Sequence, residues 1–271
     1  MGAILRLCLL SVLFASLSGA ANAESRPRRI LSLNMCADQL LIALADPSQI
    51  LALTQFARDR GMSAEAERAD HFAISRGTSE DVLALEPDLI ISGPFHAIGP
   101  QVKKRNYRII NLNPAENYPA IVTQIRQVAA AVGHPERGEV MIGRMDAELK
   151  GLRRIKGAPI AAYYQRRGYL TGTGTLVDDL MQRVGLRNLA TVMDRPVLSR
   201  MSVEEMVVAR PDYLIVETDS DRVADQGMEM LNHPALAGIP RLRLPQAWTV
   251  CGGPAYVRAA KSLSEQLRAH R

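Results

Sequence analysis

Long apolar segments are scarce in this 271-residue sequence. The one pronounced run, Leu7 to Leu17, is too short to span a bilayer as a permanent anchor. It follows the basic Arg6 and leads into a small-residue segment ending in Ala-Asn-Ala at Ala23, which predicts a cleavable secretory signal over residues 1–23. Cys8 lies inside the run with no small residues before it, so a lipid-modified cysteine is not expected. We therefore expect a soluble mature chain, exported to the periplasm.

Sequence signatures of catalysis are also missing. There is no Gly-x-Ser-x-Gly elbow, no phosphate loop ending in Gly-Lys-Ser/Thr and no His-Glu-x-x-His pair. The segment Gly172-Thr-Gly174 lacks the third glycine of a dinucleotide fingerprint and indicates a tight turn. These absences disfavour an enzyme and leave a binding protein as the leading hypothesis.

The histidines do not predict a bare metal site. A zinc or manganese carrier needs three or four convergent His and carboxylate ligands. The five histidines are scattered without ligand spacing, and only His71 and His96 could reach the rim of a predicted sheet. The full set is His71, His96, His134, His233 and His270. No metal ligands and no covalently bound cofactor are therefore predicted.

Positive charge is in modest excess, with 33 Lys and Arg against 28 Asp and Glu. Loss of the predicted signal removes Arg6 and takes the net charge from +5 to 5 − 1 = +4. The basic residues are spread along the chain, and aromatic residues make up only 4% of it. No basic stripe with interleaved aromatics appears, so nucleic acid is not an expected partner.

Two cysteines, Cys36 and Cys251, remain after removal of the predicted signal. An even number of cysteines in an oxidising compartment favours a disulfide. Cys36 follows the first predicted strand and Cys251 precedes the last predicted helix, so both lie at the ends of elements. A pair of buried thiols, or soft ligands for a metal, is the alternative.

An internal repeat dominates the rest of the sequence. Thr78–Ser92 aligns without a gap on Ser202–Val216, at a constant offset of 202 − 78 = 124 residues. Each copy begins with a hydroxyl N-cap followed by acids in the first turn, and each continues through a Pro-Asp turn into an apolar strand. One helix–turn–strand unit used twice predicts two similar α/β lobes, an arrangement suited to holding a ligand between them.

Strands alternate with short helices on both sides of a central helical stretch. The pattern predicts a parallel sheet with helices on both faces in each lobe. Between the lobes, apolar residues recur at helical spacing, with a break or kink at Gly133-His134-Pro135. The predicted organisation is a signal at 1–23, a first lobe at 24–115, a connecting helix at 116–157, and a second lobe with a terminal helix at 158–271.

The order of these motifs resembles a known family. The motifs that carry the resemblance are Arg29–Asn34, Leu83–Ile91, the central helical stretch and Leu231–Pro240. Together they resemble periplasmic binding proteins for iron complexes and vitamin B12, which feed ABC importers, over essentially the whole mature chain. The resemblance implies two Rossmann-like lobes joined by one long rigid helix, little hinge motion, a monomer and a permease dimer as partner. The ligand it implies is a ferric siderophore, haem or cobalamin.

Candidate ligand-binding residues follow from the topology. Ligands of open parallel sheets sit beyond the carboxyl ends of the strands. Aromatic faces there suit a planar or apolar chelate, and arginines suit its anionic oxygens. Basic side chains at these ends favour an anionic ferric complex of the siderophore type over neutral cobalamin. The candidates are Asn34, Arg58, Arg76, Phe95, His96, Tyr164, Arg166 and Trp248. For each, a packing aromatic or a solvated polar residue is the alternative.

Glu80 and Glu204 occupy equivalent places in the two copies of the repeat. In the family that the chain resembles, a glutamate at this place in each lobe docks onto arginines of the two permease subunits. The simpler explanation is that acids in a first turn stabilise the helix start, which needs no partner. Two other possibilities stay open: an enzyme built on a similar two-lobed frame, and a ligand sensor that signals without transport.

Overall fold

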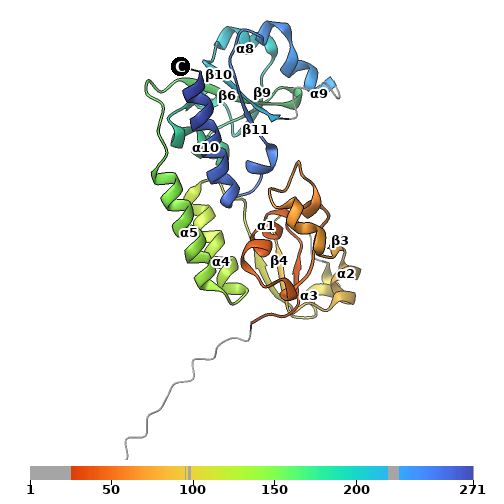
Figure 1. Ribbon diagram of the computed structural model, residues 1–271. Helices are drawn as coiled ribbons and strands as arrows, with labels where there is room; N and C mark the ends of the chain where they lie inside the picture. The colour runs from red at the N-terminus through yellow and green to blue at the C-terminus, as the bar shows by residue number, and fades with distance from the viewer. Residues whose placement is uncertain (1–25, 95, 97–98, 219–225, 271) are drawn as a thin grey trace, which may run out of the picture.

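The computed structural model describes residues 26–94, 96, 99–218 and 226–270. The predicted signal and the candidate Phe95 lie outside these residues. The chain forms two α/β lobes, one above the other, with helices along one side (Figure 1). The predicted fold class, two α/β lobes joined by helix, is confirmed.

The first lobe contains a fully parallel five-stranded sheet of order β3-β2-β1-β4-β5. Its strands are β1 (Ile30–Ser32), β2 (Ile50–Thr54), β3 (Ile74–Ser75), β4 (Leu89–Ser92) and β5 (Arg108–Asn111). Its helices are α1 (Met35–Leu44), α2 (Ser79–Leu85) and α3 (Pro100–Lys103). The strand order reverses between β1 and β4, which makes the carboxyl ends of these two strands the expected position of a ligand crevice.

The second lobe contains a mixed sheet of order β11-β10-β6-β7-β9, with β8 also paired to β6. The strands are β6 (Ile160–Gln165), β7 (Tyr169–Thr171), β8 (Arg187–Asn188), β9 (Leu198–Arg200), β10 (Tyr213–Glu217) and β11 (Arg241–Leu244). The helices are α6 (Leu176–Val184), α7 (Leu189–Val192), α8 (Val203–Ala209), α9 (Gln226–Glu229) and α10 (Pro254–Ala269).

The prediction of a parallel sheet in this lobe is only partly right. Strands β6, β8, β10 and β11 are parallel, but β7 pairs antiparallel with β6 and with β9. Gly168, with φ +72°, lies in the turn that folds β7 back onto β6.

The connector consists of two helices, α4 (Tyr118–Ala131) and α5 (Pro135–Lys150), and not of one. They pack side by side on either side of the turn at Gly133 (Figure 1). A Cβ at Gly138 of α5 would lie only 2.7 Å from the Cβ of Ala129 in α4, so this close packing requires a glycine. Helix α4 packs on α1 of the first lobe, and α5 leads to the second. The lobe boundaries at 115/116 and 157/158 stay a prediction.

The repeat folds into equivalent capped helices. The Thr78 hydroxyl accepts a hydrogen bond from the backbone N–H of Asp81, and the Ser202 hydroxyl accepts one from Glu205, each at 3.1 Å. The C-cap residues that follow α2 and α8 are Glu86 and Arg210, whose φ values of 44° and 45° are both left-handed. The same local chemistry therefore starts and stops both helices.

The aspartate of each Pro-Asp turn ties the repeat to the neighbouring strand. The Asp88 carboxylate accepts hydrogen bonds from the backbone N–H groups of Arg28, at 2.7 Å, and Arg29, at 2.9 Å. The Asp212 carboxylate accepts one from the backbone N–H of Ile160 at 2.7 Å. Each carboxylate thus satisfies backbone donors where β1 or β6 begins.

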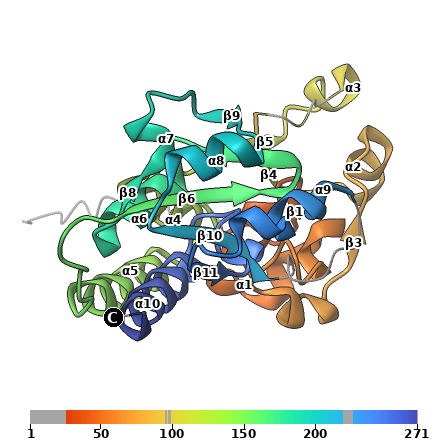
Figure 2. The same cartoon turned by 90° about the horizontal axis from the view of Figure 1, so that it is seen from above.

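A cluster of polar and aromatic side chains joins the connector to the second lobe. Tyr118 of α4 stacks on Tyr256 of α10 with ring centroids 5.6 Å apart, and the Arg183 guanidinium of α6 lies 4.9 Å from the Tyr118 ring. Asp179 of α6 accepts hydrogen bonds from the Tyr118 backbone N–H, at 3.3 Å, and from the Tyr256 hydroxyl. Seen from above, α10 lies alongside α5 (Figure 2). These contacts hold α6 and α10 of the second lobe against the connector helices.

Candidate functional site

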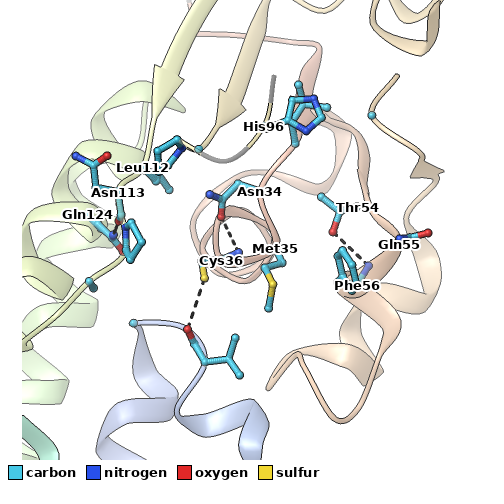
Figure 3. A pocket seen from close by; sticks show the side chains of 18 of the residues that line it. Asn34, Met35, Cys36, Thr54, Gln55, Phe56, His96, Leu112, Asn113 and Gln124 are labelled. Carbon is cyan, nitrogen blue, oxygen red and sulfur yellow. Dashed lines mark hydrogen bonds between the residues drawn. The ribbon is translucent and has the colours of Figure 1, made fainter. Parts of the chain in front are cut away.

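A pocket of about 440 Å³ opens at the carboxyl ends of the first-lobe strands. Residues at or just beyond the carboxyl end of each of the five strands line it, as expected for a parallel sheet. In Figure 3 the side chains surround the N-terminal end of α1, with His96 and Thr54 on one side and Asn113 and Gln124 on the other. Its apolar members are Leu33, Met35, Phe56, Pro94, Leu112, Pro114, Ala115 and Val250. We call this cavity the strand-end pocket.

The N-terminus of α1 faces into the strand-end pocket (Figure 3). Asn34 caps the helix, and its Oδ1 accepts hydrogen bonds from the backbone N–H groups of Cys36 at 2.8 Å and Ala37 at 3.1 Å. The positive end of the helix dipole favours a negatively charged group in front of it. Asn34, a predicted ligand-binding residue, therefore lies in the pocket and shapes its floor.

A buried carboxylate supports the pocket from behind. Asp38 is fully buried in the first turn of α1, and burial raises the pKa of its carboxyl above the ordinary value. It accepts hydrogen bonds from the Thr54 hydroxyl at 2.5 Å and the Thr54 backbone N–H at 3.2 Å. Thr54 lines the pocket at the end of β2, so Asp38 fixes that part of the wall.

The loop after β3 forms another part of the wall. Ser75, Arg76 and Gly77 all line the pocket, as does His96 after β4. Arg76 is exposed and His96 is half-buried. The predicted residues Asn34, Arg76 and His96 are thus brought together around one cavity.

Cys36 and Cys251 form a disulfide with a Cα–Cα distance of 5.2 Å. Cys36 lies at the start of α1 in the first lobe, and Cys251 lies just before α10 in the second. Cys36 lines the strand-end pocket, and so do Val250 and Gly252, the two neighbours of Cys251. The bond therefore holds a second-lobe segment against the first-lobe pocket.

The cleft continues onto the second lobe. A cavity of about 350 Å³ shares Pro114, Ala115 and Val250 with the strand-end pocket. Gln165, at the end of β6, also lines this second cavity. Its side-chain amide donates to Glu217 at 3.3 Å, and its carbonyl oxygen accepts from the Thr171 hydroxyl at 2.9 Å. The second-lobe wall is thus more polar than the first.

Three predicted ligand-binding residues lie elsewhere. Tyr164 does not face the cleft, contrary to the prediction. Its side chain is 0% exposed, and its hydroxyl donates to the Met201 carbonyl at 2.8 Å inside the second-lobe core. Trp248 is half-buried against the core and lines a separate cavity beside first-lobe residues 60–68. The Arg58 guanidinium donates to backbone carbonyls, including that of Phe72 at 2.6 Å, and so braces the loop before β3.

The remaining predicted residues are at the surface. Arg166 is exposed in the turn between β6 and β7, and the two cavities of the cleft do not include it. Glu80 and Glu204 are exposed in the first turns of α2 and α8. The docking assignment of these two glutamates rests on the resemblance and stays a prediction.

Several residues of the cleft were not predicted. Leu112–Ala115 follow β5, and their signal in the sequence is their position beyond the carboxyl end of a parallel strand. Gln124 comes from α4, and its amide donates to the Asn113 carbonyl. Only tertiary packing brings Gln124 and Val250 to the pocket.

Within the parts of the chain that the structure describes, no three His, Cys, Asp or Glu side chains converge to form a bare metal site. Likewise, no described helix combines the length and apolarity needed to cross a membrane.

Sequence comparison finds a family that covers most of the chain. The periplasmic binding protein family matches residues 30–243. A cobalamin-binding protein of Halobacterium salinarum is 20% identical over 216 residues, which cover 75% of this chain and 58% of that protein. The chain therefore spans less than two thirds of the length of the curated relatives it matches.

Solved structures share the fold over most of both chains. The periplasmic haem-binding protein RhuT of Roseiflexus sp. RS-1, in apo form, has a TM-score of 0.72 at 24% identity and covers 89% of this chain and 98% of its own. The haem-binding protein HutB of Vibrio cholerae has a TM-score of 0.71 at 18% identity, covering 88% and 98%. The vitamin B12-binding protein BtuF of Vibrio cholerae has a TM-score of 0.65 at 16% identity, covering 90% and 98%.

At identities this low, the solved structures show a shared fold alone. The family assignment comes from the sequence match over residues 30–243. The two lobes, the helical connector and the pocket between them agree with that match. The chain therefore belongs to the family of periplasmic binding proteins of the iron-complex and vitamin B12 type, which are binding proteins and not enzymes.

Proposed function

We propose that this chain is the periplasmic binding component of an ABC importer and that it captures an anionic iron chelate. The observation that carries the proposal is the strand-end pocket, whose walls are mostly apolar and whose floor is the N-terminus of α1. Its volume of about 440 Å³ falls within the ordinary range of small-molecule sites. A flat or globular organic chelate buries apolar surface against such walls.

Charge supports an anionic ligand over a neutral one. The positive end of the α1 dipole and the exposed Arg76 both lie at the strand-end pocket. An arginine fork pairs with carboxylate, catecholate or hydroxamate oxygens. Ferric siderophores and haem with ionised propionates both carry such oxygens. The sequence favours the siderophore type, and the pocket chemistry suits either chelate.

The pocket also offers side chains that haem iron accepts. His96 and Met35 both line it, and imidazole and thioether sulfur are both known ligands of haem iron. Haem is therefore the first probe to test, since its absorption spectrum reports iron ligation directly. Cobalamin is the second candidate, because the curated relative from Halobacterium salinarum is a cobalamin-binding protein.

The partner we propose is a permease dimer in the inner membrane. Glu80 and Glu204 are exposed at equivalent places on the two lobes, as required for contact with two similar subunits. Reversing both charges, Glu80→Lys with Glu204→Lys, should leave chelate affinity intact and abolish uptake through the permease. Normal uptake by the double variant would reject the docking role.

A titration panel tests the ligand. The purified mature chain should bind hemin or a ferric siderophore with a Kd in the micromolar range or tighter, and cyanocobalamin more weakly. Tight binding of cyanocobalamin with no response to any iron chelate would overturn the proposal.

A further inference from the structure

One carboxylate connects the strand-end pocket to the surface of the first lobe. Asp81 lies in the first turn of α2, next to the exposed Glu80. Its Oδ2 accepts hydrogen bonds from the Ser75 hydroxyl at 3.0 Å and from the Arg76 backbone N–H at 2.9 Å. Ser75 and Arg76 both line the pocket. A single side chain thus holds the surface helix and the ligand-facing loop together.

The loop held by Asp81 also borders His96. The Ser75 hydroxyl accepts a hydrogen bond from the Gly77 backbone N–H at 2.9 Å, and Gly77 adopts φ +73°. A Cβ at Gly77 would lie 3.1 Å from Leu33 Cδ2 and 3.2 Å from His96 Cε1. Because the loop backbone packs this closely on the imidazole, a shift of the loop also changes the wall beside His96.

Helix capping alone does not require these bonds. The Thr78 hydroxyl already accepts a hydrogen bond from the Asp81 backbone N–H, which satisfies the N-cap of α2. An acid in the first turn stabilises the helix through the dipole without any bond to a preceding strand. The contacts of Asp81 to Ser75 and Arg76 therefore do something besides starting the helix.

The repeat provides an internal comparison. Glu205 is equivalent to Asp81, since 205 − 81 = 124. Its carboxylate accepts from the Ser202 backbone N–H at 2.8 Å, which completes a capping box, and pairs with Arg195 at 2.7 Å. Neither Ser202 nor Arg195 is among the described residues that line the two cavities of the cleft. The same place in the fold thus contacts the pocket wall in one lobe only.

We infer that Asp81 is a positioning residue that couples helix α2 to the ligand-facing loop Ser75–Gly77. Coupling between two places is reciprocal, so a ligand that fixes the loop must also stabilise α2, and a partner that displaces α2 must loosen the ligand wall. The inference rests on the proposed function in taking α2, which carries Glu80, as a docking helix. It gives the permease a direct mechanical route to the bound chelate.

Backbone amide hydrogen exchange, measured with and without hemin, tests the coupling. In the wild type, hemin should slow exchange at Val82 and Leu83 of α2 but not at the equivalent Met206 and Val207 of α8. In Asp81→Ala that response of α2 should disappear, and hemin affinity should fall roughly tenfold. Asp81→Asn, which keeps one acceptor oxygen, should recover part of both effects.

Glu205→Ala is the matched control. It removes the equivalent acid, with its capping-box bond to Ser202 and its ion pair with Arg195, so it should lower the melting temperature without touching the pocket wall. Hemin affinity and the response of α2 should match the wild type. Wild-type affinity and an intact α2 response in Asp81→Ala would overturn the inference.

Failure of the proposed function gives a different result. If the wild-type protein binds neither hemin nor a ferric siderophore, the ligand assignment is at fault, and exchange in the ligand-free protein decides the coupling. Asp81→Ala, or Asp81→Asn where the alanine variant does not fold, should speed exchange at the Arg76 and Gly77 amides relative to Glu205→Ala. Unchanged exchange at these two amides would rule out a positioning role for Asp81.

Discussion

Loss of the Cys36–Cys251 disulfide should be the most destabilising small change in this protein. The bond closes a loop with a sequence separation of 215 residues. In the loop-entropy model a closure of this length stabilises the folded state by about 5 kcal/mol, at the upper end of measured values. Because Val250 and Gly252 line the strand-end pocket, the same loss should also free one wall of the site and weaken ligand binding.

Urea denaturation of three samples measures this effect. The oxidised wild type should unfold at a clearly higher urea concentration than the reduced wild type or the Cys36→Ser, Cys251→Ser double variant, and the last two should agree. Cys8 falls in the predicted signal, so the mature chain should show no other thiol to complicate the comparison. Coincident unfolding of oxidised and reduced protein would refute the reasoning.

The other predictions concern single side chains. Trp248→Ala should lower stability, by roughly 3 kcal/mol for a large packed aromatic, and leave chelate affinity unchanged, because Trp248 packs on the core away from the strand-end pocket; reduced affinity at an unchanged melting temperature would contradict this. The hydrogen bond from Arg137, with a further one from His134, lowers the pKa of the Asp46 carboxyl. The paired Asp46 carboxylate therefore contributes its full share to the free energy of unfolding above the unfolded-state pKa of about 4. This contribution is lost as the pH falls through the lower folded-state pKa. Asp46→Asn should flatten the acid side of a plot of melting temperature against pH, and an unchanged slope would show that the pairing contributes nothing.

Local chemistry made much of the fold predictable from the sequence. The repeat, its hydroxyl N-caps and its Pro-Asp turns all fold as their residues indicate. Helix α6 lies between the N-cap Thr175 and the left-handed Gly185, local signals that mark both of its ends in the sequence. The antiparallel strands β7 and β9 were missed because their pairing is long-range and depends on the turn at Gly168.

For the candidate site, the sheet topology predicts which positions of the chain lie near the pocket, but not which side chains point into it. The strand-end rule places Asn34, Arg76 and His96 at the pocket without knowledge of any side-chain contact. It does not say which face a side chain takes, because successive strand residues point to opposite faces. Both tyrosines are buried, but Tyr163 packs in one core cluster and borders the second-lobe cavity, while Tyr164, one residue further along, packs in another core cluster away from it.

Trp248 shows a second limit of the rule. It follows β11, but Gln246–Trp248 form a 3₁₀ turn that directs the chain away from the pocket and toward first-lobe residues 60–68. Val250, two residues later, returns to the strand-end pocket beside the disulfide. No local sequence signal distinguishes these positions, because the path between them is decided by the packing of the two lobes.

A hemin titration followed by absorbance tests the central claim most directly, since the claim is that the strand-end pocket holds an anionic iron chelate. The account predicts saturable binding in the micromolar range or tighter, with a spectral shift that His96→Ala changes and that Trp248→Ala leaves as in the wild type. A ferric siderophore and cyanocobalamin serve as comparison ligands in the same assay. Tight, saturable binding of cyanocobalamin together with no response to hemin or to any ferric siderophore would contradict the account.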